Sequence, residues 1–317
     1  MNPAPIQPTL DLTALRAQLA DADRFVAEEE AAYNHQIALA ADTIAAATDG
    51  CQIVWMCGPS SVGKTTTAKR LCAALENRGL QAFVISLDDF YRGIGNAPRL
   101  ADGSFDYESP EALDLPQLRR CVTELMTTGE TRLPRYNFET GQPIALRVQF
   151  RITGRTAVIF EGIQAFSPLL TDGIPREILG SPLRLFINTH TRYTNGDTPL
   201  LCRRDIRLAR RLLRDERTRG SDFEETMSMW QKVLAGDERH IFPYSDAADI
   251  LINSSLGYEP CVLGGLLADR LPSLYGTAYE ATARRLIAAF AQFPVLAPEL
   301  VPSGSVLREF IGTSCTF

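Results

Sequence analysis

Short apolar runs recur along the chain and divide it into regular segments. They are residues 52–57, 82–87, 156–160, 182–187 and 248–253, each bounded by turn-forming or charged residues. Runs of this length without polar alternation are typical of strands that are buried on both faces. Between them lie segments with apolar residues at helical spacing, such as Ala68, Leu71 and Leu75 after the first run. This order predicts an α/β fold with a five-stranded parallel sheet, right-handed crossovers and flanking helices.

Two further patterns lie outside the predicted sheet. Residues 132–138 and 146–151 alternate apolar and polar positions around Thr140-Gly141, which predicts a β-hairpin beside the sheet. Residues 11–48 are rich in Ala, Leu, Glu and Gln, which indicates one or two helices. We therefore expect an N-terminal helical extension over residues 1–45 and a main domain over residues 46–317. That domain should end in a helix and tail over about 265–317.

A glycine-rich motif joins the first predicted strand to the first helix. Gly58 to Thr65 fits the pattern G-x-x-x-x-G-K-[ST] of a phosphate-binding P-loop. Glycines let the backbone curl so that successive N–H groups face a polyphosphate, Lys64 reaches its terminal phosphates, and the Thr65 hydroxyl can bind Mg²⁺. A chance glycine-rich turn is the weaker interpretation, because both flanks are correct. The residues that we expect to hold phosphate are Gly58, Ser60, Ser61, Val62, Gly63, Lys64, Thr65 and Thr66.

Carboxylates follow two of the predicted strands. Asp88-Asp89 follows the second strand, and Glu161 follows the third. Ligands of open α/β sheets bind outside the carboxyl ends of the strands, so these side chains are candidates for a site. A single acidic residue after an apolar strand is typical of the carboxylate beside the metal in P-loop proteins. For Asp88-Asp89 a helix cap or turn is an equally good interpretation, and alternation does not decide which of the two faces a ligand. We expect Mg²⁺ near Thr65, Asp88 and Glu161.

The most charged segment covers residues 203–219. Its arginines recur at helical spacing and share one face of the predicted helix: Arg207, Arg210, Arg211 and Arg214. Like charges at this spacing destabilise an isolated helix, so they require anionic partners. One interpretation is a solvated face that neighbouring acids neutralise. The other is a lid, over about residues 195–235, that closes on transferring phosphates.

Composition excludes several classes of protein. The net charge of −6 argues against a general nucleic-acid or anionic-membrane binder. Seven cysteines without a C-x-x-C pair or zinc spacing indicate reduced thiols. No stretch approaches the roughly 18 apolar residues of a membrane helix, and the N-terminus lacks a signal sequence. We expect a cytoplasmic protein without nucleic-acid or membrane partners, and a homo-oligomer is compatible with the sequence.

Together these motifs resemble the uridine kinase and phosphoribulokinase family of P-loop kinases. They are most similar to the bacterial uridine-kinase-like nucleoside kinases, and the resemblance spans roughly residues 45 to 315. The matching segments are residues 58–65, 86–91, 107–112, 134–138, 160–163, 207–220, 241–244, 248–254 and 307–312. The ordered set of motifs is far more specific than the P-loop alone.

The resemblance implies transfer of the γ-phosphoryl group of ATP, with Mg²⁺, to a primary hydroxyl of a small molecule. A nucleoside such as uridine or cytidine is the expected acceptor. Asp88 matches the family's catalytic carboxylate, with Tyr91 and Glu108 as residues that hold the sugar. Tyr136 matches an aromatic residue of the acceptor pocket. The lid arginines of the family are matched by Arg207, Arg210, Arg214 and Arg219. We assign catalytic roles to Lys64, Arg210 and Arg214. Arg207 is expected to contact both substrates.

The chain departs from typical uridine-cytidine kinases at the acceptor. Glu108 replaces an Asp, Gly141 replaces a base-contacting His, and Glu225 replaces a Gln. An alternative is therefore a kinase of a phosphorylated sugar or polyol, whose phosphate would contact Arg92, Arg99 or Arg135. Less favoured are a GTP-driven switch, since no Asn-Lys-x-Asp motif follows the P-loop, and a non-catalytic nucleotide-binding regulator.

Overall fold

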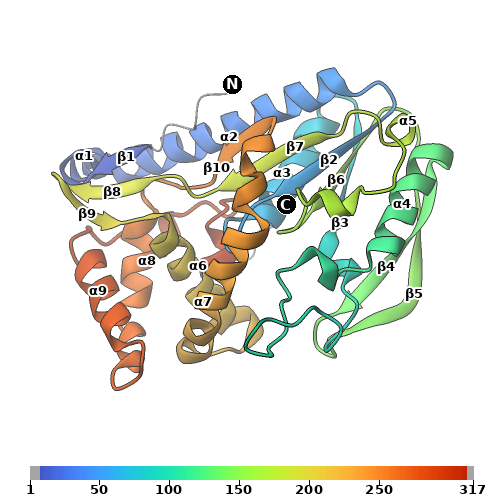
Figure 1. Ribbon diagram of the computed structural model, residues 1–317. Helices are drawn as coiled ribbons and strands as arrows, with labels where there is room; N and C mark the ends of the chain where they lie inside the picture. The colour runs from blue at the N-terminus through green and yellow to red at the C-terminus, as the bar shows by residue number, and fades with distance from the viewer. Residues whose placement is uncertain (1–7, 313–317) are drawn as a thin grey trace.

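A parallel β-sheet forms the centre of the computed structural model, which describes residues 8–312 (Figure 1). The strand order is β10-β7-β2-β6-β3, and all four pairings are parallel. The strands are β2 (Cys51–Cys57), β3 (Gln81–Ser86), β6 (Thr156–Glu161), β7 (Leu183–Asn188) and β10 (Ile250–Asn253). The predicted α/β fold with a five-stranded parallel sheet is confirmed.

Helices cover both faces of this sheet, because its strands are apolar on both sides. In β2, Val54 and Met56 face a core that includes α2 (Ala22–Ala47) and α3 (Lys64–Glu76). The alternate residues Ile53 and Trp55 face a second core that includes α4 (Leu115–Thr128). The short α5 (Arg176–Leu179) precedes β7. The two cores explain why the strand sequences show no polar alternation.

The helices that follow β7 lie together at one end of the sheet (Figure 1). They are α6 (Arg203–Arg219), α7 (Phe223–His240), α8 (Glu259–Leu267), α9 (Glu280–Phe290) and α10 (Arg308–Ile311). The arginine-rich helix α6 begins with a capping box between Cys202 and Asp205. It ends at Gly220, whose φ of 67° stops the helix in the left-handed conformation.

Two small sheets complete the regular structure. The hairpin of β4 (Glu130–Asn137) and β5 (Gln142–Arg151) lies beside the main sheet, as predicted. The second sheet, of order β1-β8-β9, was not predicted; its strands are β1 (Thr9–Asp11), β8 (Arg192–Asn195) and β9 (Thr198–Leu201). Strands of three or four residues are too short for a periodic signal. Short 3₁₀ turns cover residues 19–21, 87–90, 110–112, 168–170, 242–247, 271–274 and 298–300.

The N-terminal segment packs closely on the sheet. After α1 (Leu12–Gln18), the long α2 buries Phe25, Tyr33, Ile37 and Ile44 in the same core as α3. The proposed division at residue 45 thus separates two segments of sequence that share one core. Residues 1–7 of the proposed N-terminal extension and residues 313–317 of the proposed main domain lie outside the described part. Among residues 8–312, no helix has the length and apolar character needed to cross a membrane.

The buried face of α2 provides a test of this packing. Ile44 is 0% exposed, whereas Leu39 on the same helix is 53% exposed. We expect Ile44→Ala to lower the free energy of unfolding by roughly 2–5 kcal/mol, because it removes buried methyl groups and leaves a cavity. Leu39→Ala should change it by less than about 0.5 kcal/mol. Urea unfolding followed by circular dichroism measures both, and equal effects would contradict the packing of α2.

Candidate active site

The loop between β2 and α3 has the shape of a phosphate-binding turn. A Cβ atom on Gly58 would lie 2.2 Å from the backbone oxygen of Ile187, and one on Gly63 would lie 2.3 Å from Cγ2 of Val306. Gly63 also has a φ of 86°, which favours glycine. Ser61, with a φ of 64°, is the single non-glycine residue in the left-handed region among residues 8–312. Strain of this kind is typical of functional loops.

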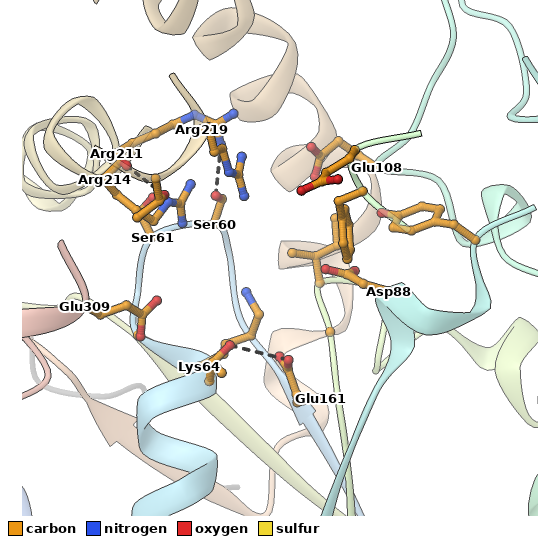
Figure 2. A pocket seen from close by; sticks show the side chains of 18 residues that line it. Ser60, Ser61, Lys64, Asp88, Glu108, Glu161, Arg211, Arg214, Arg219 and Glu309 are labelled. Carbon is orange, nitrogen blue, oxygen red and sulfur yellow. Dashed lines mark hydrogen bonds between the residues drawn. The ribbon is translucent and has the colours of Figure 1, made fainter. Parts of the chain in front are cut away.

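The loop borders a cavity of about 810 Å³, within the usual range for small-molecule sites (Figure 2). Residues from seven separate parts of the chain line it. The lining residues used below are Ser60, Ser61, Gly63, Lys64, Thr65, Asp88, Tyr91, Glu108, Phe138, Glu139, Glu161, Ile163, Arg211, Arg214, Arg219 and Glu309. The P-loop, the carboxylates after β3 and β6, and part of the arginine helix therefore meet around one space.

Two carboxylates lie beside the start of α3. Glu161, at the end of β6, accepts hydrogen bonds from Thr65 Oγ1 at 3.5 Å and Ser86 Oγ at 3.3 Å. Burial raises the pKa of Glu161 to about 7, and Lys64 opposes that rise. Asp88 opens the turn after β3, and burial raises its pKa too. A cation bound here would relieve the cost of both buried carboxylates.

A hydroxyl and two carboxylates are oxygen donors that suit Mg²⁺. Magnesium usually keeps several waters and takes one or two carboxylates plus substrate phosphates. Within residues 8–312, no group of three or more His, Cys, Asp or Glu side chains forms a ready-made metal cage. The donor set of Thr65, Asp88 and Glu161 therefore fits a magnesium ion that arrives with a phosphate ligand.

The adjacent carboxylates Asp88 and Asp89 point to different partners. Asp88 lines the cavity. Asp89 accepts a hydrogen bond from Arg135 Nη1 at 2.8 Å and another from the Tyr136 backbone N–H at 3.2 Å. Asp89 thus fastens the hairpin to the turn after β3, and Asp88 remains open to a ligand.

Helix α6 divides its arginines between the interior and the cavity. Arg207 and Arg210 are 0% exposed and do not line the cavity. Arg207 pairs with Asp237 at 2.7 Å and donates to the Ser60 carbonyl at 2.9 Å. Arg210 pairs with Glu259 at 2.8 Å and donates to the Ser254 carbonyl.

Arg207 and Arg210 thus lie beneath the P-loop and outside the cavity lining, and their expected contacts with the substrates and the catalytic role of Arg210 stay predictions. Helical spacing predicts which residues share one face of a helix. It does not predict which part of that face is buried and which part borders the cavity. Both side chains are fully engaged beneath the P-loop, where buried acids compensate their charge.

The arginines that do line the cavity share one buried carboxylate. Asp215 is 0% exposed and lies near Arg211 (3.2 Å), Arg214 (2.8 Å) and Arg219 (3.5 Å). Arg211 also donates to Ser60 Oγ at 2.9 Å, which ties this cluster to the P-loop. Burial lowers the pKa of Arg211 and of Arg219. An anion in the cavity would meet guanidinium groups that are already oriented.

The other end of the cavity is acidic and aromatic (Figure 2). Glu108 packs against Gly236 of α7, where a Cβ atom would lie 2.5 Å from Glu108 Cγ. Its Oε2 atom is buried and has no hydrogen-bond partner among residues 8–312, and burial together with nearby Asp237 raises the pKa of Glu108 to about 7. Tyr91 donates to the Tyr107 carbonyl at 3.0 Å and accepts from Gln164 at 3.2 Å. Glu108 therefore offers a free acceptor to a ligand.

The tip of the hairpin adds aromatic rings to this end. The Tyr136 ring centroid lies 5.8 Å from that of Tyr91 and 5.1 Å from that of Phe138. Phe138 lines the cavity and is 67% exposed, whereas Tyr136 does not line it directly. Arg135 bonds to Asp89 and points away from the cavity lining.

Sequence reasoning missed several cavity residues. Arg211 was placed on the arginine face without a role, although its spacing of four from Asp215 could have suggested the pair. Phe138 was part of a recognised segment but had no assigned function. Glu309 lies more than 240 residues after the P-loop, so no local pattern links the two.

The turn, the strand-end carboxylates and the arginine helix define a P-loop nucleotide-binding protein. Comparison with known proteins agrees with this class. Residues 53–168 match the family model described as the phosphoribulokinase / uridine kinase family. The match includes the P-loop and the carboxylates after β3 and β6, so this part of the chain resembles that family.

Individual relatives are distant. Uridine-cytidine kinase B of Dictyostelium discoideum is 25% identical over 201 residues, which cover 63% of this chain and 73% of that protein. Uridine-cytidine kinase A of the same organism is 27% identical over 204 residues, but the match spans only 35% of its length. The phosphoribulokinase structure from Rhodobacter spheroides aligns with a TM-score of 0.45 and 18% identity, covering 66% of this chain and 74% of that one.

The shared carboxylate of the cavity arginines gives a stability test. We expect Asp215→Asn to lower the free energy of unfolding by roughly 3–5 kcal/mol, because it leaves guanidinium groups without their buried counter-charge. Glu216→Gln is a matched control, since Glu216 makes a half-exposed pair with Arg270 that is worth about 0–1 kcal/mol. Chemical denaturation of both variants measures the difference. A small effect of Asp215→Asn would show that the cluster does not depend on this carboxylate.

The raised pKa of Glu108 predicts a pH-dependent stability. The folded state holds the Glu108 proton up to about pH 7, whereas an ordinary Glu loses it near 4.5. Stability should therefore fall as the pH rises from about 4.5 through 7. Between pH 5 and pH 8, Glu108→Gln should gain on the order of 1–3 kcal/mol relative to wild type. Unfolding of both proteins across this range tests it, with exposed Glu111→Gln as the control that should show no such gain.

Proposed function

We propose that the protein is an ATP-dependent kinase that transfers the γ-phosphoryl group to a primary hydroxyl of a neutral small molecule, a nucleoside. The observation that carries the proposal is the cavity itself, in which Asp88 and the P-loop Lys64 line the same space. The family match over residues 53–168 and the names of the relatives, which are uridine-cytidine kinases, agree with it. Neither fixes the acceptor of this chain.

The nucleotide would bind on the P-loop side. Backbone N–H groups of residues 60–66 and the first turn of α3 would face its phosphates. Lys64 now donates to the carbonyls of Gly58 (2.9 Å) and Pro59 (3.1 Å), and would turn towards the β- and γ-phosphates. Magnesium held by Thr65, Asp88 and Glu161 would neutralise phosphate charge. This side of the cavity would bind and orient the donor.

Asp88 would orient the acceptor hydroxyl and accept its proton. Proton transfer can be late in a loose transition state, so a carboxylate of moderate basicity is sufficient. Arg211, Arg214 and Arg219 would stabilise the charge that spreads over the transferring group, since Asp215 already orients them. The helix α6 would also limit the access of water, which competes with the acceptor.

The charge of the cavity favours a neutral acceptor over a phosphorylated one. Glu108 and Glu139 lie at the acceptor end, and the arginines of the lining belong to α6 on the nucleotide side. The basic residues considered for an acceptor phosphate have other positions. Arg135 bonds to Asp89, Arg99 stacks 4.2 Å from the Phe105 ring centroid, and Arg92 lies outside the lining.

Aromatic rings next to the acceptor end favour a nucleoside among neutral acceptors. Phe138 is exposed at the cavity and could stack on a base, while the unpartnered Glu108 Oε2 could accept from sugar hydroxyls. A polyol would use Glu108 but would leave Phe138 without a partner.

Substitution of the base gives the direct test. We expect Asp88→Asn to lower kcat by about 10²–10⁴-fold, because it removes the proton acceptor. The ATP dissociation constant should change far less. Lys64→Ala should reduce both turnover and ATP binding. An ADP-release assay across nucleosides, pentose phosphates and polyols measures turnover and finds the acceptor.

Asp89→Asn is the matched control, because Asp89 faces Arg135 rather than the cavity, and it should retain most activity. Near-normal turnover of Asp88→Asn would overturn the role of Asp88. A pentose phosphate as the best acceptor would overturn the neutral-acceptor assignment and leave the kinase assignment intact.

A further inference from the structure

A carboxylate from a distant part of the chain lies against the phosphate-binding turn. Glu309 belongs to the short helix α10, and its Oε2 accepts a hydrogen bond from Thr66 Oγ1 at 2.6 Å. Glu309 also lines the cavity. Figure 2 shows it across the cavity from Asp88 and Glu108, beside the start of α3.

The segment that carries Glu309 is firmly anchored. Val306 and Phe310 are 0% exposed, and Val306 packs against the bare Cα of Gly63 in the P-loop. Phe310 lies beneath the Arg210 guanidinium, 4.9 Å from ring centroid to Cζ. Arg217, near the end of α6, donates to the Glu309 carbonyl at 2.8 Å. The position of the carboxylate is therefore set by its neighbours on both sides.

The partner of this carboxylate belongs to an anion-binding turn. Thr66 lies in the first turn of α3, where the free N–H groups and the helix dipole favour negative charge. The Glu309 carboxylate thus places a negative charge beside this turn and accepts from the Thr66 hydroxyl, a donor that a phosphate oxygen could also use. A nucleotide that placed a phosphate on the same turn would bring two negative charges together.

We propose that Glu309 competes internally with nucleotide phosphate for the first turn of α3, so that a bound nucleotide displaces its carboxylate. The inference rests on the proposed nucleotide-binding function of the P-loop. It makes Glu309 a determinant of nucleotide affinity that lies outside the P-loop motif.

Titration calorimetry tests the proposal by comparing wild type with Glu309→Gln. The ligands are ATP, with and without Mg²⁺, and inorganic tripolyphosphate. Glutamine keeps the size and can still bond to Thr66, but it removes the charge. We expect the dissociation constants for ATP and tripolyphosphate to fall about tenfold. Glu299→Gln is the control, because Glu299 is an exposed residue of the preceding turn and should bind like wild type.

The outcomes separate the proposal from its alternatives. Unchanged or weaker tripolyphosphate binding by Glu309→Gln, with a wild type that binds ATP, would overturn the proposal and leave the kinase function standing. Weaker ATP binding with unchanged tripolyphosphate binding would also overturn it, because it would indicate a contact to the ribose. Absence of phosphate binding by both proteins would refute the nucleotide function together with the inference.

A second measurement uses the wild type alone and does not depend on folding of the variant. Hydrogen exchange of the backbone amides of residues 305–312 should quicken when tripolyphosphate is added, because the Thr66–Glu309 bond is lost. Exchange in α9, none of whose residues lines the cavity, serves as the internal reference. Slower or unchanged exchange in residues 305–312 would count against displacement.

Discussion

Two buried ion pairs beneath the P-loop support the rest of the structure. Arg207 bridges Asp237 of α7 and the Ser60 carbonyl, while Arg210 bridges Glu259 of α8 and carbonyls of the loop region. Charges in a protein interior are costly unless each has a close partner and its remaining donors are satisfied. The loop therefore keeps its shape only when α6, α7 and α8 are packed together. In return, the loop supplies acceptors without which those arginines could not be buried.

The same helix performs a second task on its outer side. Arg211, Arg214 and Arg219 reach the cavity, and Asp215 holds them in one cluster. Buried pairs and cavity-lining arginines can share one helix, because only residues three or four apart lie on neighbouring parts of its surface. Helix α6 thus fixes the loop from below and presents positive charge to whatever the loop binds.

Much of the fold could be predicted from local patterns. The apolar runs correctly located the strands of the central sheet, and the glycine and lysine spacing located the loop, because both depend on residues that are near in sequence. The strands β1, β8 and β9 escaped prediction because each has only three or four residues, and β1 pairs with β8 across some 180 residues of sequence. The candidate site was harder to predict, because it depends on the direction in which each side chain points and not only on the place of the residue in the sequence. Alternation could not separate Asp88 from Asp89, and the arginine pattern could not tell buried Arg210 from cavity-lining Arg211.

The contact between Val306 and Gly63 has a consequence for the order of assembly during synthesis. A ribosome makes the glycine-rich turn long before it makes the valine that packs on it. Strand β1 likewise waits for β8, which is translated some 180 residues later. A nascent chain that already contains every residue of the P-loop motif therefore still lacks Val306, which packs against Gly63 of that motif. The phosphate-binding turn should therefore reach its final packing only after translation has passed residue 306.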